Sequence, residues 1–62
     1  MEKFGELDVV RLKDGRKGTV LDFFDGGSVV LLEIADSHGR TLDLPFVPVE
    51  EVDEILYSHK AR

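Results

Sequence analysis

The fold is decided by residues 17–35, KGTVLDFFDGGSVVLLEIA, in which two apolar runs flank the dipeptide Gly26-Gly27. Both runs are rich in Val, Leu, Ile and Phe, the side chains that suit a pleated, half-buried strand. Glycine readily adopts the positive φ angles that a two-residue hairpin turn requires. The stretch therefore predicts a β-hairpin with strands over residues 17–24 and 28–35.

The charged side chains predict the register of this hairpin. A two-residue turn pairs the residues of one face as Phe24 with Val29, Asp22 with Leu31 and Val20 with Glu33, and those of the other face as Phe23 with Val30, Leu21 with Leu32 and Thr19 with Ile34. The two carboxylates of the first face belong in water, so the second face should point to the core. Phe24, Val29 and Leu31 then form an apolar patch on the solvent side. We expect this patch to be covered either by the C-terminal segment, if the sheet curls into a barrel, or by a partner.

Glycine and aspartate mark further turns, near residues 14–15 and 36–39. The apolar segments beside these turns are predicted to be strands over residues 7–12 and 40–46. In the second of these segments apolar and polar side chains alternate, as in a half-buried strand.

The chain changes character after Pro48. Proline suits the first position of a helical turn, and the acids that follow it complement the positive N-terminal end of such a turn. We expect one 3₁₀ turn over residues 49–52 and a fifth strand over residues 54–57. An α-helix over residues 49–59 is the alternative.

These elements predict an all-β domain whose core takes apolar side chains from every strand. The expected core residues are Val10, Leu12, Leu21, Phe23, Val30, Leu32, Ile34, Leu42, Leu44, Val52 and Ile55. We expect residues 1–6 to lead into a domain over residues 7–57, and residues 58–62 to form a frayed tail.

Length, cysteine content and charge restrict the function classes. With 62 residues and no cysteine, the chain can form one small domain without disulfides, thiolate zinc sites or cysteine nucleophiles. The net charge of −5 is concentrated in residues 21–59, which hold nine acids and Arg40 as the sole Lys or Arg. This surface should repel nucleic acid and attract a basic partner. Residues 1–6 contain no apolar leader segment, so we expect a cytoplasmic protein without a membrane anchor.

The order of the elements resembles that of SH3-like small barrels, in which a 3₁₀ turn commonly precedes the fifth strand. We therefore expect a small five-stranded SH3-like barrel. The chain also resembles a family of short bacterial proteins known as domain of unknown function 4926. The shared features are an Asp-Val-Val opening at residues 8–10, a Gly-Thr-Val at residues 18–20, the turn and strand SHGRTL at residues 37–42, and an acidic turn before the last strand.

This second resemblance covers residues 7–56, and its motifs are structural rather than catalytic. The chain departs from the family pattern in a shorter first loop, residues 13–17, and in an apolar Leu31 where a solvent-facing polar residue is expected. The resemblance implies a stand-alone module, in some members encoded beside a toxin-like protein, and thus an antitoxin or immunity role.

Residues 13–24 also resemble the KOW motif, a short barrel segment of ribosomal and transcription proteins that meet RNA. That resemblance implies phosphate contacts by Lys13, Arg16 and Lys17, with Arg11 nearby. Phe24 is the exposed aromatic candidate for stacking on a base, and the acids around it disfavour nucleic acid.

The sequence contains no recognisable catalytic, metal or cofactor motif. Residues 15–18 lack the spacing of a phosphate-binding loop and lead into a strand. His38 and His59 have no further ligand at zinc spacing. Adjacent acids occur at residues 50–51 and 53–54, but general acid or base catalysis needs a cleft, which a chain of this length can hardly build. We therefore expect no enzyme and no cofactor.

The expected function is non-catalytic binding of a protein partner or of a second copy of the chain. The expected interface combines the apolar patch with acids that would meet a basic surface: Phe24, Val29, Leu31, Asp22, Glu33, Glu50, Glu51, Asp53 and Glu54. The alternatives are a KOW-like nucleic-acid module that uses Arg11, Lys13, Arg16 and Lys17, and a homodimeric structural domain.

Overall fold

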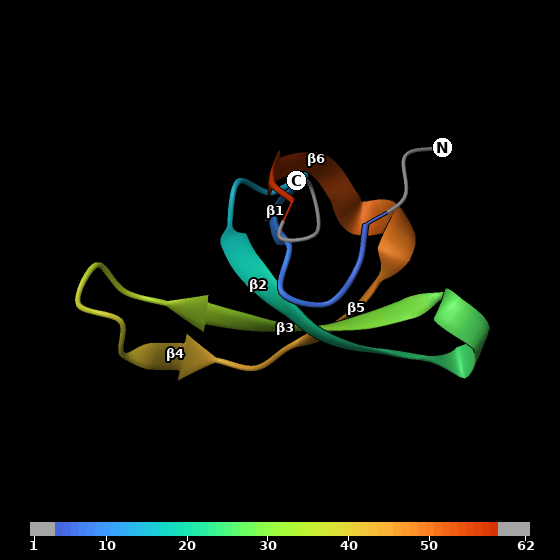
Figure 1. Ribbon diagram of the computed structural model, residues 1–62, viewed down its shortest axis with the longest axis horizontal. Coiled ribbons are helices and arrows are strands. Elements are labelled where there is room, and N and C mark those ends of the chain that lie inside the picture. The colour runs from blue at the N-terminus through green and yellow to red at the C-terminus, as the bar shows by residue number, and fades with distance from the viewer. Residues whose placement is uncertain (1–3, 59–62) are drawn as a thin grey trace.

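A computed structural model describes residues 4–58, which form a single antiparallel sheet (Figure 1). Its strands are β1 (Val9–Leu12), β2 (Lys17–Phe24), β3 (Val29–Ala35), β4 (Thr41–Asp43), β5 (Phe46–Pro48) and β6 (Val52–Tyr57). Two 3₁₀ turns, η1 (Asp25–Gly27) and η2 (Val49–Glu51), join β2 to β3 and β5 to β6. The all-β class is confirmed, and so is the 3₁₀ turn before the last strand, whereas the alternative helix over residues 49–59 is wrong. Most of the predicted tail, residues 59–62, lies outside the described residues.

The sheet is open and has six strands rather than the predicted five. Its order is β4-β3-β2-β1-β6, and β5 pairs with β3 beside β4. The predicted strand over residues 40–46 is divided into β4 and β5 because the chain is interrupted at Leu44 and Pro45. Proline has no N–H to donate to a ladder, and here Pro45 contributes only its carbonyl oxygen, which accepts the Leu32 N–H at 3.1 Å.

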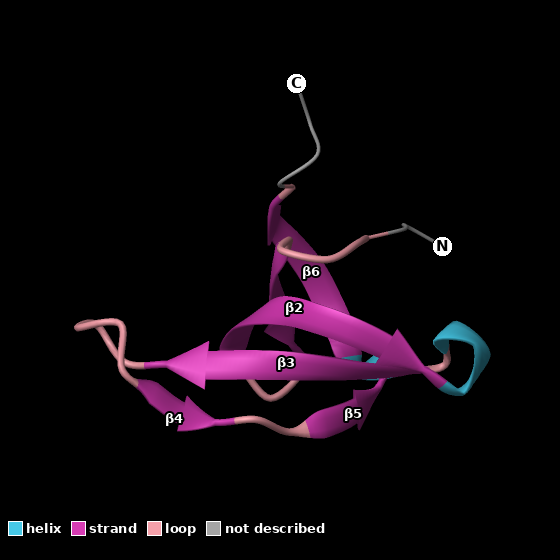
Figure 2. Ribbon diagram, turned by 60° about the horizontal axis from the view of Figure 1, so that its bottom comes forward, coloured by secondary structure: helices cyan, strands magenta, loops and turns pink. Residues whose placement is uncertain are grey.

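The sheet bends so that β6 lies at a steep angle to β3 (Figure 2). Shifts in register accompany the bend, between Val20 and Asp22 of β2 and at two places in the pairing of β1 with β6. An extra residue in one strand bends it and increases its twist. The bend creates the concave side on which the core lies.

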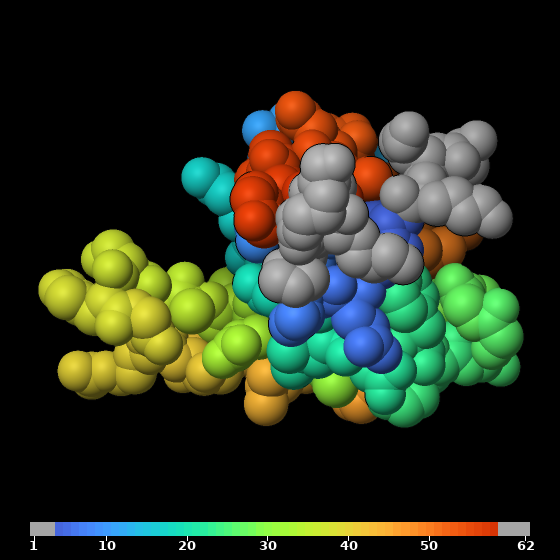
Figure 3. All heavy atoms as spheres, in the orientation of Figure 1, coloured from blue at the N-terminus to red at the C-terminus, as the bar shows by residue number. Residues whose placement is uncertain are grey.

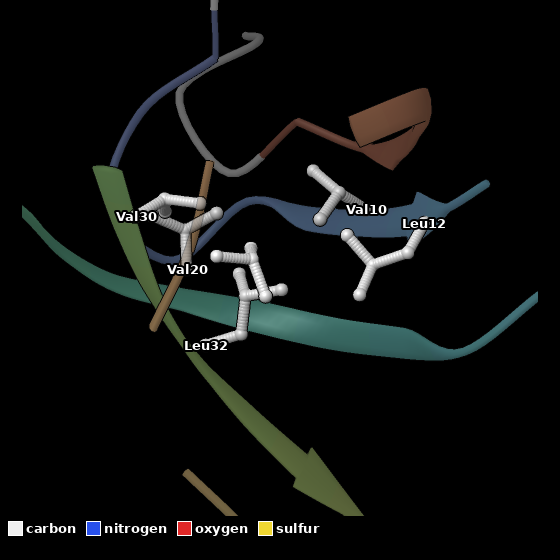
Figure 4. Packing of buried hydrophobic residues seen from close by; sticks show 6 residues of the cluster. Val10, Leu12, Val20, Val30 and Leu32 are labelled. Atoms are coloured by element: carbon white, nitrogen blue, oxygen red, sulfur yellow. The ribbon is translucent and has the colours of Figure 1, made fainter. Parts of the chain in front are cut away.

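The core is a cluster of six buried apolar side chains: Val10 and Leu12 of β1, Val20 of β2, Val30 and Leu32 of β3, and Val47 of β5. Figure 4 shows the five labelled side chains gathered between the crossing strands. Phe4, Phe23, Val52 and Ile55 are partly buried against this cluster. Eight of the ten core and packing residues come from β1, β2, β3 and β6, so the bend of the sheet, more than any single hairpin, closes the core.

Two predicted core residues lie in solvent instead. Leu42 and Leu44 have 64% and 51% of their surface exposed. The hairpin of β3 and β4 projects from the body of the molecule as an arm (Figures 1 and 3). Since β1, β2 and β6 do not extend along this arm, the alternation in residues 40–46 has no core to face, and Ile34 is only half-buried.

The predicted register holds near the turn and fails beyond Leu21. Phe24 pairs with Val29, Phe23 with Val30 and Asp22 with Leu31, as expected. Leu21 has no partner in the ladder, so Val20 pairs with Leu32 and Thr19 with Glu33. This shift turns Val20 into the core and leaves Leu21 half-buried, which corrects the predicted pairs of Val20 with Glu33, Leu21 with Leu32 and Thr19 with Ile34.

The first strand begins at Val9 because a turn precedes it. The Asp8 N–H donates to the Gly5 carbonyl at 3.1 Å, and a carboxylate oxygen of Asp8 accepts the Gly5 N–H at 2.8 Å. Leu7 has a φ of 71°, which is left-handed backbone and incompatible with a strand. The predicted strand over residues 7–12 is therefore shorter at its start.

Candidate functional site

The candidate site is the convex side of β2, β3 and β5, which the register defines residue by residue. Residues that pair directly across an antiparallel sheet point to the same side of it. Leu31 pairs with Asp22 on one flank and with Phe46 on the other, and Val29 pairs in the same way with Phe24 and Pro48. Glu33 follows Leu31 by two residues and so lies on the same side. We call this side the outer face and define it by these residues: Asp22, Phe24, Val29, Leu31, Glu33, Phe46 and Pro48.

An aromatic pair lies across the outer face. The rings of Phe24 and Phe46 have centroids 5.4 Å apart and meet edge to face at 61°. Their surfaces are 40% and 62% exposed. Val29 and Leu31 lie half-buried beside them. The predicted patch of Phe24, Val29 and Leu31 is thus brought together by the sheet, and in the described residues no terminal segment is paired over it.

Phe46 and Pro48 belong to the outer face and were missing from the predicted interface. Both flank Val47, which is buried and pairs with Val30. The alternation of Phe46, Val47 and Pro48 was the available signal, but it was hidden by the longer alternation through Leu42 and Leu44. The longer alternation passes through the interruption at Pro45, and it predicts that Leu42 and Leu44 are buried although both are exposed.

Two of the predicted interface acids lie beside this apolar group. Asp22 occupies the same row as Leu31 and Phe46, and Glu33 follows Leu31 by two residues, so its side chain points to the same side. One oxygen of Asp22 accepts the Phe23 N–H at 2.7 Å, and Glu33 accepts the Thr41 hydroxyl. Within residues 4–58 no ion pair involves either carboxylate.

The other predicted acids lie elsewhere. Asp53 and Glu54 belong to β6, at the opposite edge of the sheet, where Glu54 forms an ion pair with Arg11 and Asp53 lies 3.9 Å from the same guanidinium. Glu50 and Glu51 belong to η2, and the Glu51 carbonyl accepts the Lys13 N–H at 2.9 Å. The structure therefore does not gather all six predicted acids on one surface.

Two of the four predicted nucleic-acid contacts, Arg11 and Arg16, form ion pairs with acids of the same chain. In the turn between β1 and β2, Arg16 Nε lies 2.9 Å from Asp14 Oδ2, and the Arg16 N–H donates to Asp14 Oδ1 at 3.0 Å. Donation by this backbone N–H, and next by the guanidinium, lowers the pKa of Asp14. Arg11 is engaged by Glu54. Lys13 and Lys17 are exposed and have no ion pair among the described residues.

Other kinds of site find little support in the described part of the chain. Residues 4–58 contain no group of three or more His, Asp or Glu placed to hold a metal ion. In the same residues, every buried side-chain nitrogen or oxygen has a hydrogen-bond partner. No helix of this part is long and apolar enough to cross a membrane.

Comparison of the chain with protein-family models, with curated proteins and with solved structures found no match. The resemblances described above therefore rest on the quoted motifs alone.

Proposed function

We propose that the protein is a small, non-catalytic binding module of the SH3-like kind, and that its outer face docks on a protein partner. The observation that carries this proposal is the exposed pair of Phe24 and Phe46 beside Leu31, on a side of the sheet that the described residues leave uncovered. Aromatic side chains are enriched among the residues that dominate binding energy at protein interfaces.

The free energy gained by covering the outer face is large enough for a specific contact. Burying one such side chain completely is worth about 1.5–3 kcal/mol. Because the rings of Phe24 and Phe46 are still partly exposed in the free protein, a partner that covers them would gain part of this free energy. The two rings already contact each other in the free protein, so binding would order fewer rotamers than it would for two separate side chains, which reduces its entropic cost. A partner that covers this side would thus gain affinity from a preformed surface.

The resemblance to the family of short bacterial proteins suggests the biological setting. In that setting the protein is a cytoplasmic antitoxin or immunity partner, and the outer face with its acids covers a basic, apolar surface of a toxin-like protein. The net charge of −5 supports this choice because it would accelerate encounter with a basic protein.

A nucleic-acid function through Arg11, Lys13, Arg16 and Lys17 has weaker support. Two of these four cations already face a carboxylate, Arg11 at Glu54 and Arg16 at Asp14. Phosphate binding draws its free energy from cations that release counterions, so a pair of lysines on an acidic protein offers little. A titration with RNA at low salt should therefore give no saturable binding.

The proposed function is tested by comparing two identical substitutions at different places. Leu31→Lys puts a charge in the middle of the outer face, whereas Leu56→Lys puts the same charge on β6, where Leu56 is already 39% exposed. Proteins that co-purify with the wild-type chain from its native cells would be identified, purified and titrated against all three forms. Sedimentation equilibrium of each form alone measures self-association.

The expected result is that Leu31→Lys weakens binding to the purified partner by at least about tenfold, a loss of roughly 1.4 kcal/mol, while Leu56→Lys leaves it unchanged. Circular dichroism should show that both variants remain folded. A self-association that disappears in Leu31→Lys alone would identify the partner as a second copy. Equal binding and equal mass for all three forms would contradict the proposal.

A further inference from the structure

The outer face has a direction, because its apolar and acidic residues are separated along the strands. At the end next to η1, the row of Phe24, Val29 and Pro48 is entirely apolar. The middle row combines Asp22 with Leu31 and Phe46. At the other end, Thr19 pairs with Glu33, and Glu33 accepts the Thr41 hydroxyl. Neighbouring rows are two residues, or about 7 Å, apart along the strand, so the surface changes from apolar to acidic over about 14 Å.

Neither carboxylate of the acidic end has an ion-pair partner in the described residues. No Lys or Arg occurs in residues 19–24 of β2, in β3 or in β5, and the nearest cation along β2 is Lys17, two residues before Thr19 on the same side, which forms no ion pair either. The three ion pairs of the described chain join Arg11 and Arg16 to acids that lie off the outer face. Any occupant that covers Asp22 and Glu33 must therefore supply positive charge, since a carboxylate removed from water without a partner is strongly unfavourable.

A second copy of the chain meets this requirement poorly, because Lys17 is the one cation that β2, β3 and β5 carry. Whichever way two outer faces are apposed, the acidic end of one meets either the acidic end or the apolar end of the other. The first arrangement opposes like charges and the second desolvates carboxylates against Phe24 and Val29. The charge pattern thus favours a different protein over a homodimer.

We infer that the outer face binds one segment of a partner protein that runs along β3, with apolar side chains over Phe24 and Phe46 at one end and Lys or Arg over Asp22 and Glu33 at the other. This inference rests on the proposed function and adds to it the chemistry and the direction of the bound segment. The apolar end supplies most of the affinity, and the charged end fixes the orientation.

The test uses a displayed library of random peptides, selected on the wild-type protein and counter-selected on Phe46→Asp. Phe46 is exposed, so this substitution should leave the fold intact, and an amide NMR spectrum checks that it does. A selected peptide would be synthesised and titrated against the wild type and against the double variant Asp22→Asn/Glu33→Gln. A spin label at the basic end of the peptide would report its direction by broadening nearby amide signals.

The inference predicts that selected peptides carry Lys or Arg on one side of an apolar cluster. Their affinity should fall about tenfold in the double variant, in line with the loss of two charge contacts of about 0.7 kcal/mol each. The spin label should broaden the signals of Thr19, Glu33 and Thr41 more than those of Phe24 and Val29.

Two results would overturn it in different ways. The first result is that the selected peptides require Phe46 but lack basic residues, bind the double variant as well as the wild type, or place the label near Phe24. Any of these would contradict the inference and leave the proposed function standing. If no selected peptide distinguishes Phe46→Asp from the wild type, both the inference and the proposed function fail.

Discussion

At Gly18, β2 has no room for a side chain against β3. A Cβ atom at this position would lie 3.2 Å from both the Glu33 carbonyl oxygen and the Leu32 Cβ, closer than ordinary van der Waals contact. Gly27 presents the opposite case, because a Cβ there meets nothing within 4 Å but the residue has a φ of +96°. One glycine is thus needed for space and the other for backbone conformation.

This contrast predicts different substitution tolerances. Gly18→Ala should destabilise the fold by about 1–3 kcal/mol, because neither contact atom is the free end of a side chain. Gly27→Asn should cost less, since asparagine enters the left-handed region more easily than other residues and has open space here. Urea unfolding of both variants measures the difference. A Gly27→Asn variant less stable than Gly18→Ala would show that the assignment of roles is wrong.

In the turn between β1 and β2, the pKa of Asp14 depends mainly on a backbone hydrogen bond. The Arg16 backbone N–H is the main cause that lowers the pKa of Asp14 below its ordinary value of 3.8, and the guanidinium contributes less. Because the folded-state pKa is the lower one, the carboxylate stabilises the fold above the unfolded-state pKa, and this stabilisation is lost as pH falls through the folded-state pKa. An NMR titration should therefore give Asp14 a pKa below 3.8, and Arg16→Leu should retain most of that lowering. A return to the ordinary pKa in Arg16→Leu would assign the effect to the side chain instead.

At the scale of elements, the arm formed by β3 and β4 separates two leucines that look equivalent in the sequence. Leu32 is fully buried in the core, whereas Leu42 on β4 is exposed. Leu32→Ala should cost about 2–5 kcal/mol, enough to unfold much of a domain this small. Leu42→Ala should stay within about 0.5 kcal/mol of the wild type. Thermal melts of the two variants provide the comparison, and a comparable loss in both would mean that the arm packs on the core.

The same elements show what the sequence could predict and what it could not. The Gly26-Gly27 turn was predictable because glycine is the residue that such a turn needs, and with it came the pairing of Phe24 with Val29 and the exposure of the apolar patch. The bulge at Leu21 was not predictable, because an extra residue in one strand depends on how the whole sheet bends. Alternation in residues 40–46 predicted a buried side without indicating whether any other strand would extend that far.

The residues of the candidate site also differ in whether the sequence alone could predict them. Phe24, Val29, Leu31, Asp22 and Glu33 follow from the first hairpin alone, since local register places them together. Phe46 and Pro48 join them only through the long-range pairing of β5 with β3. Asp53 and Glu54 looked like part of the same acidic surface, but the pairing of β6 with β1 places them against Arg11.

For the molecule as a whole, the β6 edge and the outer face of the sheet differ in how their acids are paired. At the β6 edge an exposed acid, Glu54, is matched by a cation of the same chain. Along the outer face, Asp22 and Glu33 have no such match within the described residues, and apolar side chains lie next to them. A small core gains little stability by itself, and a partner that binds only the folded chain would raise its melting temperature.

The most direct test of a protein-docking outer face is site-specific photocrosslinking in living cells. Replacing Phe46 by p-benzoylphenylalanine puts a photoreactive ring on the outer face, next to Leu31. Replacing Tyr57 puts the same ring on β6, at a site of similar exposure, 55% against 62% for Phe46. We expect an adduct with one recurring protein from position 46, lost when Leu31→Lys is added, and no such adduct from position 57. The absence of an adduct at position 46, or the same adducts from both positions, would contradict it.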